Sequence, residues 1–409
     1  MKCRHCHTQL TLPMVDLGSA PPSNAYLTTK TLKQPEKWFP LRVLVCNNCW
    51  LVQTEDFAAF NEMFDSEYAY FSSFSTSWLK HAELYTKRMI ERFDLGKGSH
   101  VVEVAANDGY LLQYFDSACV PCLGVEPTAN TAAAAREKGI EIVEEFFGEA
   151  IGHRLAKTGK SADLTAANNV LAHVPDINDF VRGFTAILKP DGVSTFEFPW
   201  LLNLVEQNQF DTIYHEHFSY LSLSAVRRIF EANGLQVFDV EELPTHGGSL
   251  RVFAQRLDTK THIANEAVAQ ILAKEDAAGL NSTDAYFDTQ RKADAAKDGL
   301  VRFLLDARAD GKTVAGYGAA AKGNTLLNYA GVRPDLMPFV VDRNPAKSGK
   351  FMPGSRIPIV TEETLKETKP DYIIILPWNL REEVSAQLSY ARDWGAKFVT
   401  AIPALVVSQ

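Results

Sequence analysis

Hydrophobic and polar residues alternate in blocks over positions 97–126, and this pattern predicts a strand, a turn, a helix and a second strand. A short apolar run over 101–104 is broken by a polar Asn-Asp-Gly turn, after which apolar residues recur at helical spacing. A second apolar run, over 120–125, ends on Glu126. The stretch therefore predicts the first βαβ unit of an open α/β sheet.

The turn in this unit favours a nucleoside over a pyrophosphate. Its residues Asn107, Asp108 and Gly109 do not form the Gly-x-Gly-x-x-Gly pattern of dinucleotide-binding turns. Glu126 lies about 20 residues further on, where acids in such folds bind ribose hydroxyls. A nucleoside without phosphate suits this turn, and S-adenosylmethionine is the common one, so we expect it as the cofactor.

Strand and helix patterns continue to residue 200 and resume after residue 311, as in a parallel sheet with helical crossovers. Before residue 200 the pattern predicts helices over 78–89, 130–138 and 180–188, strands over 140–143, 163–170 and 193–198, and a turn over 189–192. The stretch 262–308 is helical, and beyond it the pattern predicts strands over 312–316, 339–342, 372–376 and 398–402, with a helix over 325–329.

Four of the six cysteines form two Cys-x-x-Cys pairs, Cys3 with Cys6 and Cys46 with Cys49. Each pair offers two thiolates on one turn, so two pairs supply the four sulfurs of a tetrahedral zinc site. We expect residues 1–55 to hold a structural Zn²⁺, because so short a segment cannot build a large core of its own. Reduced structural cysteines are the alternative.

Composition and charge exclude several classes of protein. The 409 residues suffice for two or three domains, and 46% of them are hydrophobic. The net charge of -9 gives no electrostatic reason to bind nucleic acid or an anionic membrane. We find no apolar run of the about 18 residues that span a membrane, and no signal peptide. We expect a cytoplasmic protein. Cys119 and Cys122 lack a second pair nearby, so we expect two buried thiols.

A cluster of titratable residues follows the fifth predicted strand. Tyr214, His215, Glu216 and His217 place two histidines around an acid, and this combination suits general acid/base chemistry. A metal site is a weaker alternative, because residues two apart face opposite ways on a strand and poorly share a face on a helix. Structural histidines remain the third possibility. His173 lies close behind the strand over 163–170.

Two glycine-containing segments are candidates for substrate binding. His246 and Gly247 begin a segment whose glycines suit close backbone approach, and Arg251 suits an anion or a keto oxygen. A β-turn with a surface arginine is the alternative. The turn 316–324 opens a helix, whose N-terminus attracts phosphate, and Lys322 adds positive charge. Alone, this turn suggests a dinucleotide, but its glycine spacing is weak evidence.

In this order, the features resemble the sugar C-methyltransferase family over essentially the full length of the chain. The matching segments are Cys3-x-x-Cys6 with Cys46-x-x-Cys49, Tyr68-x-Tyr70-x-Ser72-Ser73, Glu103 with Asn107-Asp108-Gly109, Gly124-x-Glu126-Pro127, Glu145-Phe146-Phe147, Asn168-Asn169 with His173, Tyr214-x-Glu216-His217, His246-Gly247-Gly248-Ser249-x-Arg251 and Gly316-Tyr317-Gly318-Ala319-x-x-Lys322-Gly323. One departure is Ala105, where the family usually has glycine.

The resemblance implies an α/β fold of three parts. These are a small zinc-binding domain over 1–60, a class I methyltransferase Rossmann-like domain over 61–255, and a C-terminal Rossmann-like domain over 256–409 that binds the nucleotide sugar. It implies transfer of a methyl group from S-adenosylmethionine to C3 of a nucleotide-activated 4-keto-deoxysugar. The nucleotide is expected to be dTDP, with GDP or CDP as alternatives, and the protein is expected to be a monomer.

The resemblance also implies roles for individual residues. His217 is the expected base that removes the C3 proton, and Glu216 sets its tautomer or contacts the sugar. Tyr214, Tyr68 or His173 holds the C4 oxyanion. The expected cofactor-binding residues are Glu103, Ala105, Asn107, Asp108, Gly109, Glu126, Pro127, Glu145, Phe146, Phe147, Asn168 and Asn169. The expected substrate-binding residues are Tyr70, Ser72, Ser73, Trp200, His246, Gly247, Arg251, Tyr317, Gly318, Lys322 and Asn324.

Three alternative functions remain open at this point. The C-terminal glycine turn would suit an NAD(P)-dependent oxidoreductase. The central domain would suit an O- or N-methyltransferase of small molecules. Ala105 would allow a zinc-dependent binding module with a degenerate enzyme domain.

Overall fold

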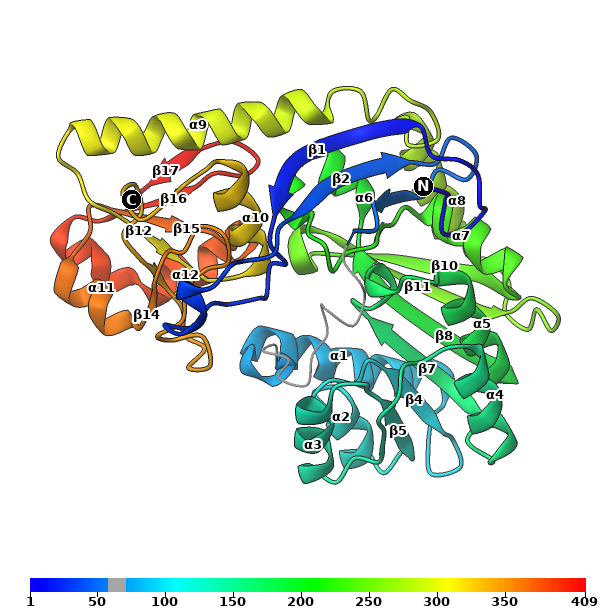
Figure 1. The fold of residues 1–409 in the computed structure, drawn as a ribbon. Helices are drawn as coiled ribbons and strands as arrows, with labels where there is room; N and C mark the ends of the chain where they lie inside the picture. Colours follow the sequence, from blue (N-terminus) through cyan, green and yellow to red (C-terminus); the bar gives the residue numbers. More distant parts are fainter. Residues whose placement is uncertain (58–70) are drawn as a thin grey trace.

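The computed structural model describes residues 1–57 and 71–409, and three β-sheets organise them (Figure 1). Tyr68 and Tyr70, expected at the active site, lie outside the described residues. Among the described residues, no helix is both long and apolar enough to cross a membrane. The sheets occur in the order that the sequence predicts, with a small sheet followed by two larger α/β sheets.

The first sheet is antiparallel and has four strands in the order β1-β2-β3-β9. Its strands are β1 (Leu12–Ala20), β2 (Phe39–Val45), β3 (Val52–Thr54) and β9 (Ser219–Tyr220). The last strand comes from far along the chain, directly after the predicted histidine cluster. The N-terminal module is therefore joined to the central α/β part by main-chain pairing as well as by side chains.

The second sheet has seven strands in the order β10-β11-β8-β7-β4-β5-β6. These are β4 (Val101–Val104), β5 (Cys122–Val125), β6 (Ile142–Val143), β7 (Ala162–Asn168), β8 (Leu188–Pro199), β10 (Leu235–Leu243) and β11 (Ser249–Arg256). The five strands from β8 to β6 are parallel, whereas β11 is antiparallel to both of its neighbours. Every residue of β4 is buried, as expected for a central strand covered on both faces.

Helices cover this sheet and connect its strands. They are α1 (Thr76–Phe93), α2 (Leu112–Ser117), α3 (Ala129–Glu137), α4 (Glu149–Lys157), α5 (Ile177–Ile187), α6 (Leu201–Glu206) and α7 (Leu223–Ala232). The turn predicted over 189–192 is wrong, because β8 begins directly after α5 and runs through it. A side chain at Gly192 would meet the carbonyl oxygen of Ala162 at 2.6 Å, so the glycine lets the strand stay against β7.

The third sheet is also mostly parallel, in the order β14-β13-β12-β15-β16-β17, and only β17 is antiparallel. Its strands are β12 (Val314–Tyr317), β13 (Val340–Val341), β14 (Ile359–Val360), β15 (Tyr372–Ile375), β16 (Lys397–Thr400) and β17 (Val406–Ser408). The helices of this region are α8 (Glu266–Ala277), α9 (Thr289–Ala309), α10 (Ala321–Tyr329), α11 (Glu362–Thr368) and α12 (Arg381–Gln387). The long helix α9 lies along one side of the molecule in Figure 1.

Helix α10 begins earlier than the sequence pattern predicts. It starts at Ala321, so Lys322 and Asn324 lie on its first turn and not in a loop. The segment between β1 and β2 reaches the C-terminal sheet, where Leu27 pairs with Phe351 in an isolated antiparallel bridge. This bridge joins the N-terminal and C-terminal parts of the chain.

Candidate functional site

The turn after β4 has an unusual backbone. Ala105, Asn107 and Gly109 have φ angles of 60°, 49° and 74°, so every second residue of the turn is left-handed. The amides of Ala105 and Ala106 both donate to the carbonyl oxygen of Val125, at 2.8 and 3.2 Å. Since a left-handed conformation favours glycine, the alanine at position 105 is strained.

Glu126, at the end of β5, holds this turn in place. Its Oε2 accepts a 2.9 Å hydrogen bond from the amide of Asn107. Its Oε1 accepts from both the amide and the hydroxyl of Thr128. Pro127 lies between Glu126 and Thr128 in the sequence, shortly before α3 begins at Ala129. The carboxylate therefore lies beside the turn, as the sequence predicts, and the protein already supplies three of its hydrogen bonds.

Buried polar side chains face the same edge of the sheet. Glu103 is fully buried, and burial raises its pKa well above the usual value, against the lowering effect of the Tyr110 hydroxyl. Among the described residues, Asp108 Oδ1 and Asn168 Oδ1 are buried without a hydrogen-bond partner. Buried polar atoms in folded proteins are almost always bonded, so this edge suits a polar ligand.

Ser72 and Ser73 support the turn through their backbone. The amide of Ser72 donates to Asn107 Oδ1 at 2.9 Å, and the amide of Ser73 donates to Asp108 Oδ2 at 3.3 Å. The sequence predicts these serines in the substrate site. Their position beside the turn brings them to the predicted cofactor site instead.

The three residues predicted beside the cofactor after β6 differ in their surroundings. Glu145 is exposed and forms an ion pair with Arg154. The ring of Phe147 packs at 4.8 Å from that of Phe184, in the core below α5. Phe146 is 54% exposed. The three residues closely follow β6, which pairs with β5.

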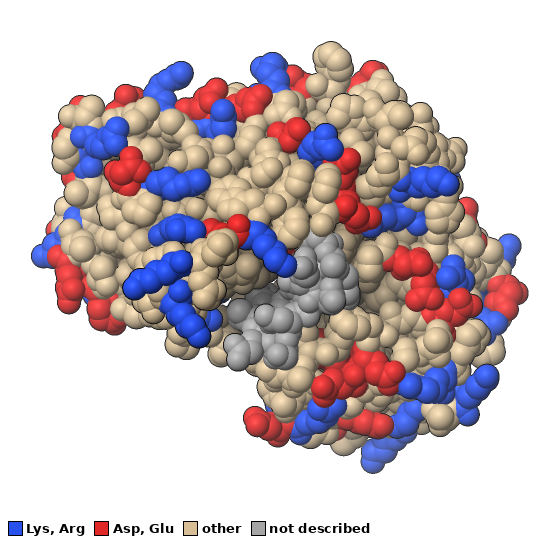
Figure 2. Space-filling model, viewed as in Figure 1, with Lys and Arg blue, Asp and Glu red and all other residues tan. Residues whose placement is uncertain are grey.

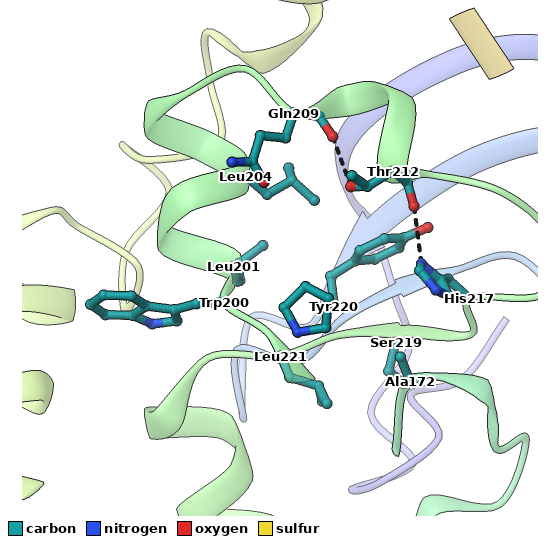
Figure 3. Close-up of a pocket in the computed structure, with 11 residues that line it drawn as sticks. Ala172, Trp200, Leu201, Leu204, Gln209, Thr212, His217, Ser219, Tyr220 and Leu221 are labelled. Atoms are coloured by element: carbon teal, nitrogen blue, oxygen red, sulfur yellow. Dashed lines mark hydrogen bonds between the residues drawn. The ribbon is translucent and has the colours of Figure 1, made fainter. Parts of the chain in front are cut away.

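His217 lies in a fixed orientation within the predicted titratable cluster. Its Nδ1 is 3.0 Å from the carbonyl oxygen of Thr212, which can only accept a hydrogen bond, so the proton resides on Nδ1 (Figure 3). Its Nε2 is left as an acceptor, and the hydroxyl of Tyr214 donates to it at 2.7 Å. The ring of His173 lies edge-on to His217, with centroids 4.6 Å apart.

Both histidines are held neutral. Burial lowers the pKa of His217 well below its usual value, and the neighbouring His173 lowers it further. Burial lowers the pKa of His173 to about 4. A neutral imidazole is the form that accepts a proton, and the Tyr214 hydroxyl lies at the nitrogen of His217 that carries the lone pair.

Glu216 does not set the tautomer of His217, since Thr212 does. Its Oε1 accepts hydrogen bonds of 3.3 Å from the backbone and the side-chain amide of Asn24. Burial raises the pKa of Glu216, and these hydrogen bonds oppose the rise. His215 faces the carbonyl oxygens of Phe39 and Pro40, away from His217. The two histidines of the motif therefore have different surroundings.

A small cavity lies behind His217. It has a volume of about 20 Å³, and Figure 3 shows Trp200, Tyr220 and Ser219 among its lining residues. Trp200, predicted to bind substrate, donates its indole N–H to Glu275 at 2.7 Å. A cavity of this size holds a water molecule at most.

His246 contacts residues of both the central and the C-terminal part of the chain. Its backbone is left-handed, with φ 56°, and its Nε2 is 3.1 Å from the side-chain nitrogen of Asn169, which follows β7. Its ring lies 5.3 Å from that of Trp78 on α1. Lys322, from α10, donates to the carbonyl oxygen of His246 at 3.4 Å. Residues from the central and C-terminal parts thus meet at this loop.

The sequence analysis missed a pair of residues beside Lys322. The indole N–H of Trp378 donates to Asp211 at 2.8 Å, and the Lys322 ammonium lies 4.7 Å from the centre of the Trp378 ring. Burial raises the pKa of Asp211 to about 7 and lowers that of Lys322 to about 8. Asp211 stands just before the histidine cluster in the sequence, but nothing in the sequence pattern connects it with Trp378.

A groove of about 720 Å³ opens next to these residues. It lies between the loop around Gly247 on the central part and the segment 378–383 on the C-terminal part. A side chain at Gly247 would meet the Trp378 ring at 2.5 Å, so the glycine permits this approach. Figure 2 shows several Lys and Arg side chains on the C-terminal part of one face of the molecule.

Arg251 is not available to a ligand. It is 2% exposed, and its guanidinium donates to Glu197 at 2.8 Å and to Glu241 at 3.4 Å. Although burial opposes ionisation of Glu197, hydrogen bonds from His81 and Arg251 lower its pKa to about 2. The predicted role of Arg251 in binding an anion has no support in this arrangement, because the guanidinium lies over Tyr85 of α1 and pairs with Glu197 of β8.

The C-terminal glycine turn is filled by groups of this chain. Asp342 occupies the position of a ribose-binding acid, yet its Oδ2 accepts from the amide of Ala319 at 2.8 Å. Lys347 is 3.5 Å from the same carboxylate. A side chain at Gly318 would meet Pro377 at 2.5 Å. This arrangement disfavours a dinucleotide.

Two other predicted residues of this region are buried. Tyr317 is 5% exposed on β12, and Asn324 is fully buried on α10. Neither amide atom of Asn324 has a hydrogen-bond partner among residues 1–57 and 71–409. Tyr317 therefore belongs to the core of the third sheet, and its hydroxyl, like the amide of Asn324, is buried without a hydrogen-bond partner among the described residues.

The four predicted zinc ligands converge. The Sγ atoms of Cys3, Cys6, Cys46 and Cys49 all lie within 4.8 Å of one another. Sulfurs at such separations, from two Cys-x-x-Cys turns, fit a tetrahedral zinc site with Zn–S bonds of about 2.3 Å. Three of the four are buried, so the site is closed, as in structural zinc sites.

The remaining pair of cysteines lies apart from this cluster. Cys122 is partly buried, and burial raises its thiol pKa to about 12. Cys119 is exposed, so the expectation of two buried thiols holds only in part.

Comparison with known proteins matches three family models in sequence order. They are "Putative zinc binding domain" at residues 3–64, "Methyltransferase domain" at 78–240 and "C-methyltransferase C-terminal domain" at 244–403. The C-methyltransferase NovU of Streptomyces niveus is 35% identical over 402 residues, which cover 98% of this chain and 95% of NovU. The chain belongs to the C-methyltransferase family. It is an S-adenosylmethionine-dependent enzyme, and its expected fold class is confirmed.

Other relatives match only part of the chain. A ubiquinone biosynthesis O-methyltransferase of Salmonella paratyphi A is 29% identical over 110 residues, which cover 27% of this chain and 41% of that protein. The magnesium protoporphyrin IX methyltransferase of Synechocystis, solved with bound SAH, is 15% identical, with a TM-score of 0.35, over 44% of this chain and 83% of that one.

The edge around β4, β5 and β7 fits the cofactor of this C-methyltransferase. The left-handed turn at Ala105, the carboxylate of Glu126 and the free oxygens of Asp108 and Asn168 provide backbone and side-chain groups for a nucleoside and an amino acid. A side chain at Gly124 would meet Ala106 at 2.7 Å, so the glycine keeps the turn close to the sheet. When bound, S-adenosylmethionine supplies an electrophilic methyl group.

Proposed function

We propose that this enzyme methylates C3 of a nucleotide-activated 4-keto-deoxysugar, with His217 as the base. The observation that carries the proposal is the Tyr214–His217 pair, whose imidazole has its proton fixed on Nδ1 and its lone pair on Nε2. A carbon acceptor needs such a base, because carbon becomes a nucleophile only after it loses a proton. The 4-keto group acidifies the proton on C3.

Tyr214 relays the proton in this proposal. Its oxygen accepts the proton from C3 while its own proton passes to Nε2 of His217, 2.7 Å away. The electron pair of the broken C–H bond forms the enolate between C3 and C4. The Nδ1–H of His217 remains bonded to the carbonyl oxygen of Thr212, and this bond stabilises the imidazolium that forms.

His173 is the group that we propose for the C4 oxygen. It lies edge-on to His217, follows β7, and is neutral at pH 7 because burial lowers its pKa to about 4. The neutral ring has one N–H, which would have to leave its hydrogen bond with the Glu216 backbone to reach the developing oxyanion. Tyr68 stays a candidate from the resemblance, outside the described residues.

We propose the groove beside Trp378 as the site of the nucleotide. Its volume of about 720 Å³ lies in the usual range of ligand pockets, which is about 300–1,000 Å³. Lys322 supplies a positive charge next to it and replaces Arg251 as the expected partner of the diphosphate. The buried amide of Asn324 is a second candidate contact on α10.

These positions suggest a role for each of the three domains. We propose residues 1–60 as the zinc-binding domain, 61–255 as the methyltransferase domain and 256–409 as the nucleotide-sugar domain. By resemblance, the nucleotide is dTDP, with GDP and CDP as alternatives, and the enzyme acts as a cytoplasmic monomer. The occupied glycine turn at Asp342 favours a substrate-holding role for the third domain over an NAD(P) site.

A substrate panel tests the proposal. The enzyme is incubated with methyl-labelled S-adenosylmethionine and with dTDP-, GDP- and CDP-linked 4-keto-deoxysugars, and the products are analysed by mass spectrometry and NMR. We expect label on C3 of one or more of them. Label on oxygen or nitrogen would indicate an O- or N-methyltransferase, and tight binding of NAD(P) would favour the oxidoreductase alternative.

A further inference from the structure

The zinc module contacts the histidine segment through its last strand. Thr54, at the end of β3, donates its hydroxyl proton to the carbonyl oxygen of His217 at 2.9 Å. Its amide donates to the carbonyl oxygen of Phe218 at 3.2 Å. One residue earlier, Gln53 pairs with Ser219 in the β3–β9 ladder. The segment that carries His217 therefore contacts β3 and leads directly into β9, the edge strand of the zinc module's sheet.

The first zinc knuckle holds the same segment. Arg4, between two of the cysteines, has its guanidinium 4.7 Å from the centre of the Phe218 ring and donates to the Phe218 carbonyl oxygen at 3.4 Å. The amide of Arg4 also donates to Gln53 at 2.9 Å, and Gln53 donates to Cys3 Sγ at 3.3 Å. The Gln53 side chain therefore contacts both the sulfur of Cys3 and the amide of Arg4, and Arg4 contacts the histidine segment at Phe218.

The segment between the knuckles reaches the site from another direction. Asn24 donates through its backbone and its side chain to Oε1 of Glu216, at 3.3 Å each. Two residues later, the hydroxyl of Tyr26 donates to the carbonyl oxygen of Ala319 in the C-terminal glycine turn at 2.6 Å. Oε2 of Glu216 is buried without a partner among the described residues.

We infer that Thr54, Arg4 and Asn24 are positioning residues for methyl transfer. In this role, the zinc module fixes the backbone of His217 and the carboxyl group of Glu216 relative to the C-terminal domain. A zinc site that stabilised only its own module would not need three polar contacts with one short segment of another domain. The inference rests on the proposed function only for its kinetic consequence, since the contacts exist in the free protein.

The main test compares Thr54→Val with Thr54→Ser. Valine keeps the shape of threonine and removes the hydroxyl, whereas serine keeps the hydroxyl. We expect Thr54→Val to lower kcat about tenfold, because a misplaced catalytic group costs up to about 100-fold in rate. The KM for S-adenosylmethionine should stay unchanged, and Thr54→Ser should restore kcat. Asn24→Ala should act in the same direction through Glu216.

Hydrogen exchange gives a readout that does not depend on a substrate. In the ligand-free protein, we expect faster amide exchange over 213–220 in Thr54→Val and Asn24→Ala, with zinc content at the wild-type level. Thr28→Val is the matched control, because Thr28 is exposed in the same module and its hydroxyl contacts only Thr31 among the described residues. It should change neither exchange over 213–220 nor kcat.

The outcomes separate this inference from the proposed function. If wild type converts a 4-keto-deoxysugar and Thr54→Val has wild-type kcat, the positioning role is wrong while the function stands. If Thr54→Val loses zinc or opens the whole module, the role is merely structural and the inference fails. If wild type converts no such sugar, the proposed function fails, and unchanged exchange over 213–220 would then overturn the inference independently.

Discussion

The hydroxyl of Tyr214 lies 2.7 Å from Nε2 of His217, whose other nitrogen is committed to the carbonyl oxygen of Thr212. Because Nδ1 already carries a proton, the imidazole accepts a further proton on Nε2. The Tyr214 hydroxyl is the group that donates to this nitrogen. Two side chains that act as one unit lose their function together, so their substitutions are not additive.

The first prediction concerns this unit. His217→Asn and Tyr214→Phe should each lower kcat by about 10²–10⁴-fold, the usual contribution of a positioned base, and the double variant should be no worse than His217→Asn. Single-turnover assays measure the rate, and calorimetry checks that S-adenosylmethionine still binds. His215→Asn is the matched control, since His215 faces Phe39 and Pro40, and it should affect stability more than rate. Additive losses would separate the two residues.

The pH dependence follows from the surroundings of the histidines. A base acts when unprotonated, and burial holds the pKa of His217 well below 6.5. The acidic limb of kcat should therefore lie well below the pH of an ordinary histidine, with full activity at pH 6.5. A limb centred near 6.5 would exclude His217 as the base.

Stability should change over the same range of pH. The folded-state pKa of His173 is about 4, against 6.5 for an ordinary histidine. Below about pH 6.5 the unfolded chain binds a proton that the folded protein does not, so the free energy of unfolding falls as the pH drops towards 4. In His173→Gln this fall should be shallower. Denaturant titrations between these pH values measure the difference, and equal slopes would contradict it.

Ala105→Gly should stabilise the enzyme. The φ angle of 60° at Ala105 costs about 1 kcal/mol for a residue with a side chain, and glycine removes most of that cost. The neighbouring Ala106→Gly is the control. Ala106 is fully buried without a positive φ, so this change should destabilise the protein. Thermal unfolding measures both, and S-adenosylmethionine should bind Ala105→Gly at least as well as wild type.

Arg251→Met should lower stability without changing nucleotide binding. Removal of one partner of a buried ion pair costs roughly 3–5 kcal/mol, because Glu197 keeps an uncompensated charge. The double variant with Glu197→Gln should recover part of the loss. Arg256→Met, on the same strand, removes a pair with the exposed Asp258 and should cost at most about 1 kcal/mol. A raised KM for the nucleotide sugar at wild-type stability would restore Arg251 to the binding site.

The sequence pattern predicts what depends on neighbouring residues, and it fails where distant segments meet. Apolar runs locate β4, β5 and β7, and strand ends locate Glu126 and Asn168, because such signals are local. Glu197 lies 54 residues from Arg251, and Asn24 lies 192 residues from Glu216. These contacts arise only when distant segments of the folded chain come together.

The zinc site provides the last prediction. Chelation, or Cys46→Ser, should release the metal and unfold the N-terminal module, because binding energy at such sites is folding energy, typically about 10–16 kcal/mol in small zinc domains. The ring of Trp50 stacks on Tyr286 with centroids 6.5 Å apart, so fluorescence should report the loss. Cys122→Ser, outside the cluster, is the control and should keep one equivalent of zinc. A metal-free protein with unchanged fluorescence and thermal unfolding would show that the cysteines stabilise the module without zinc.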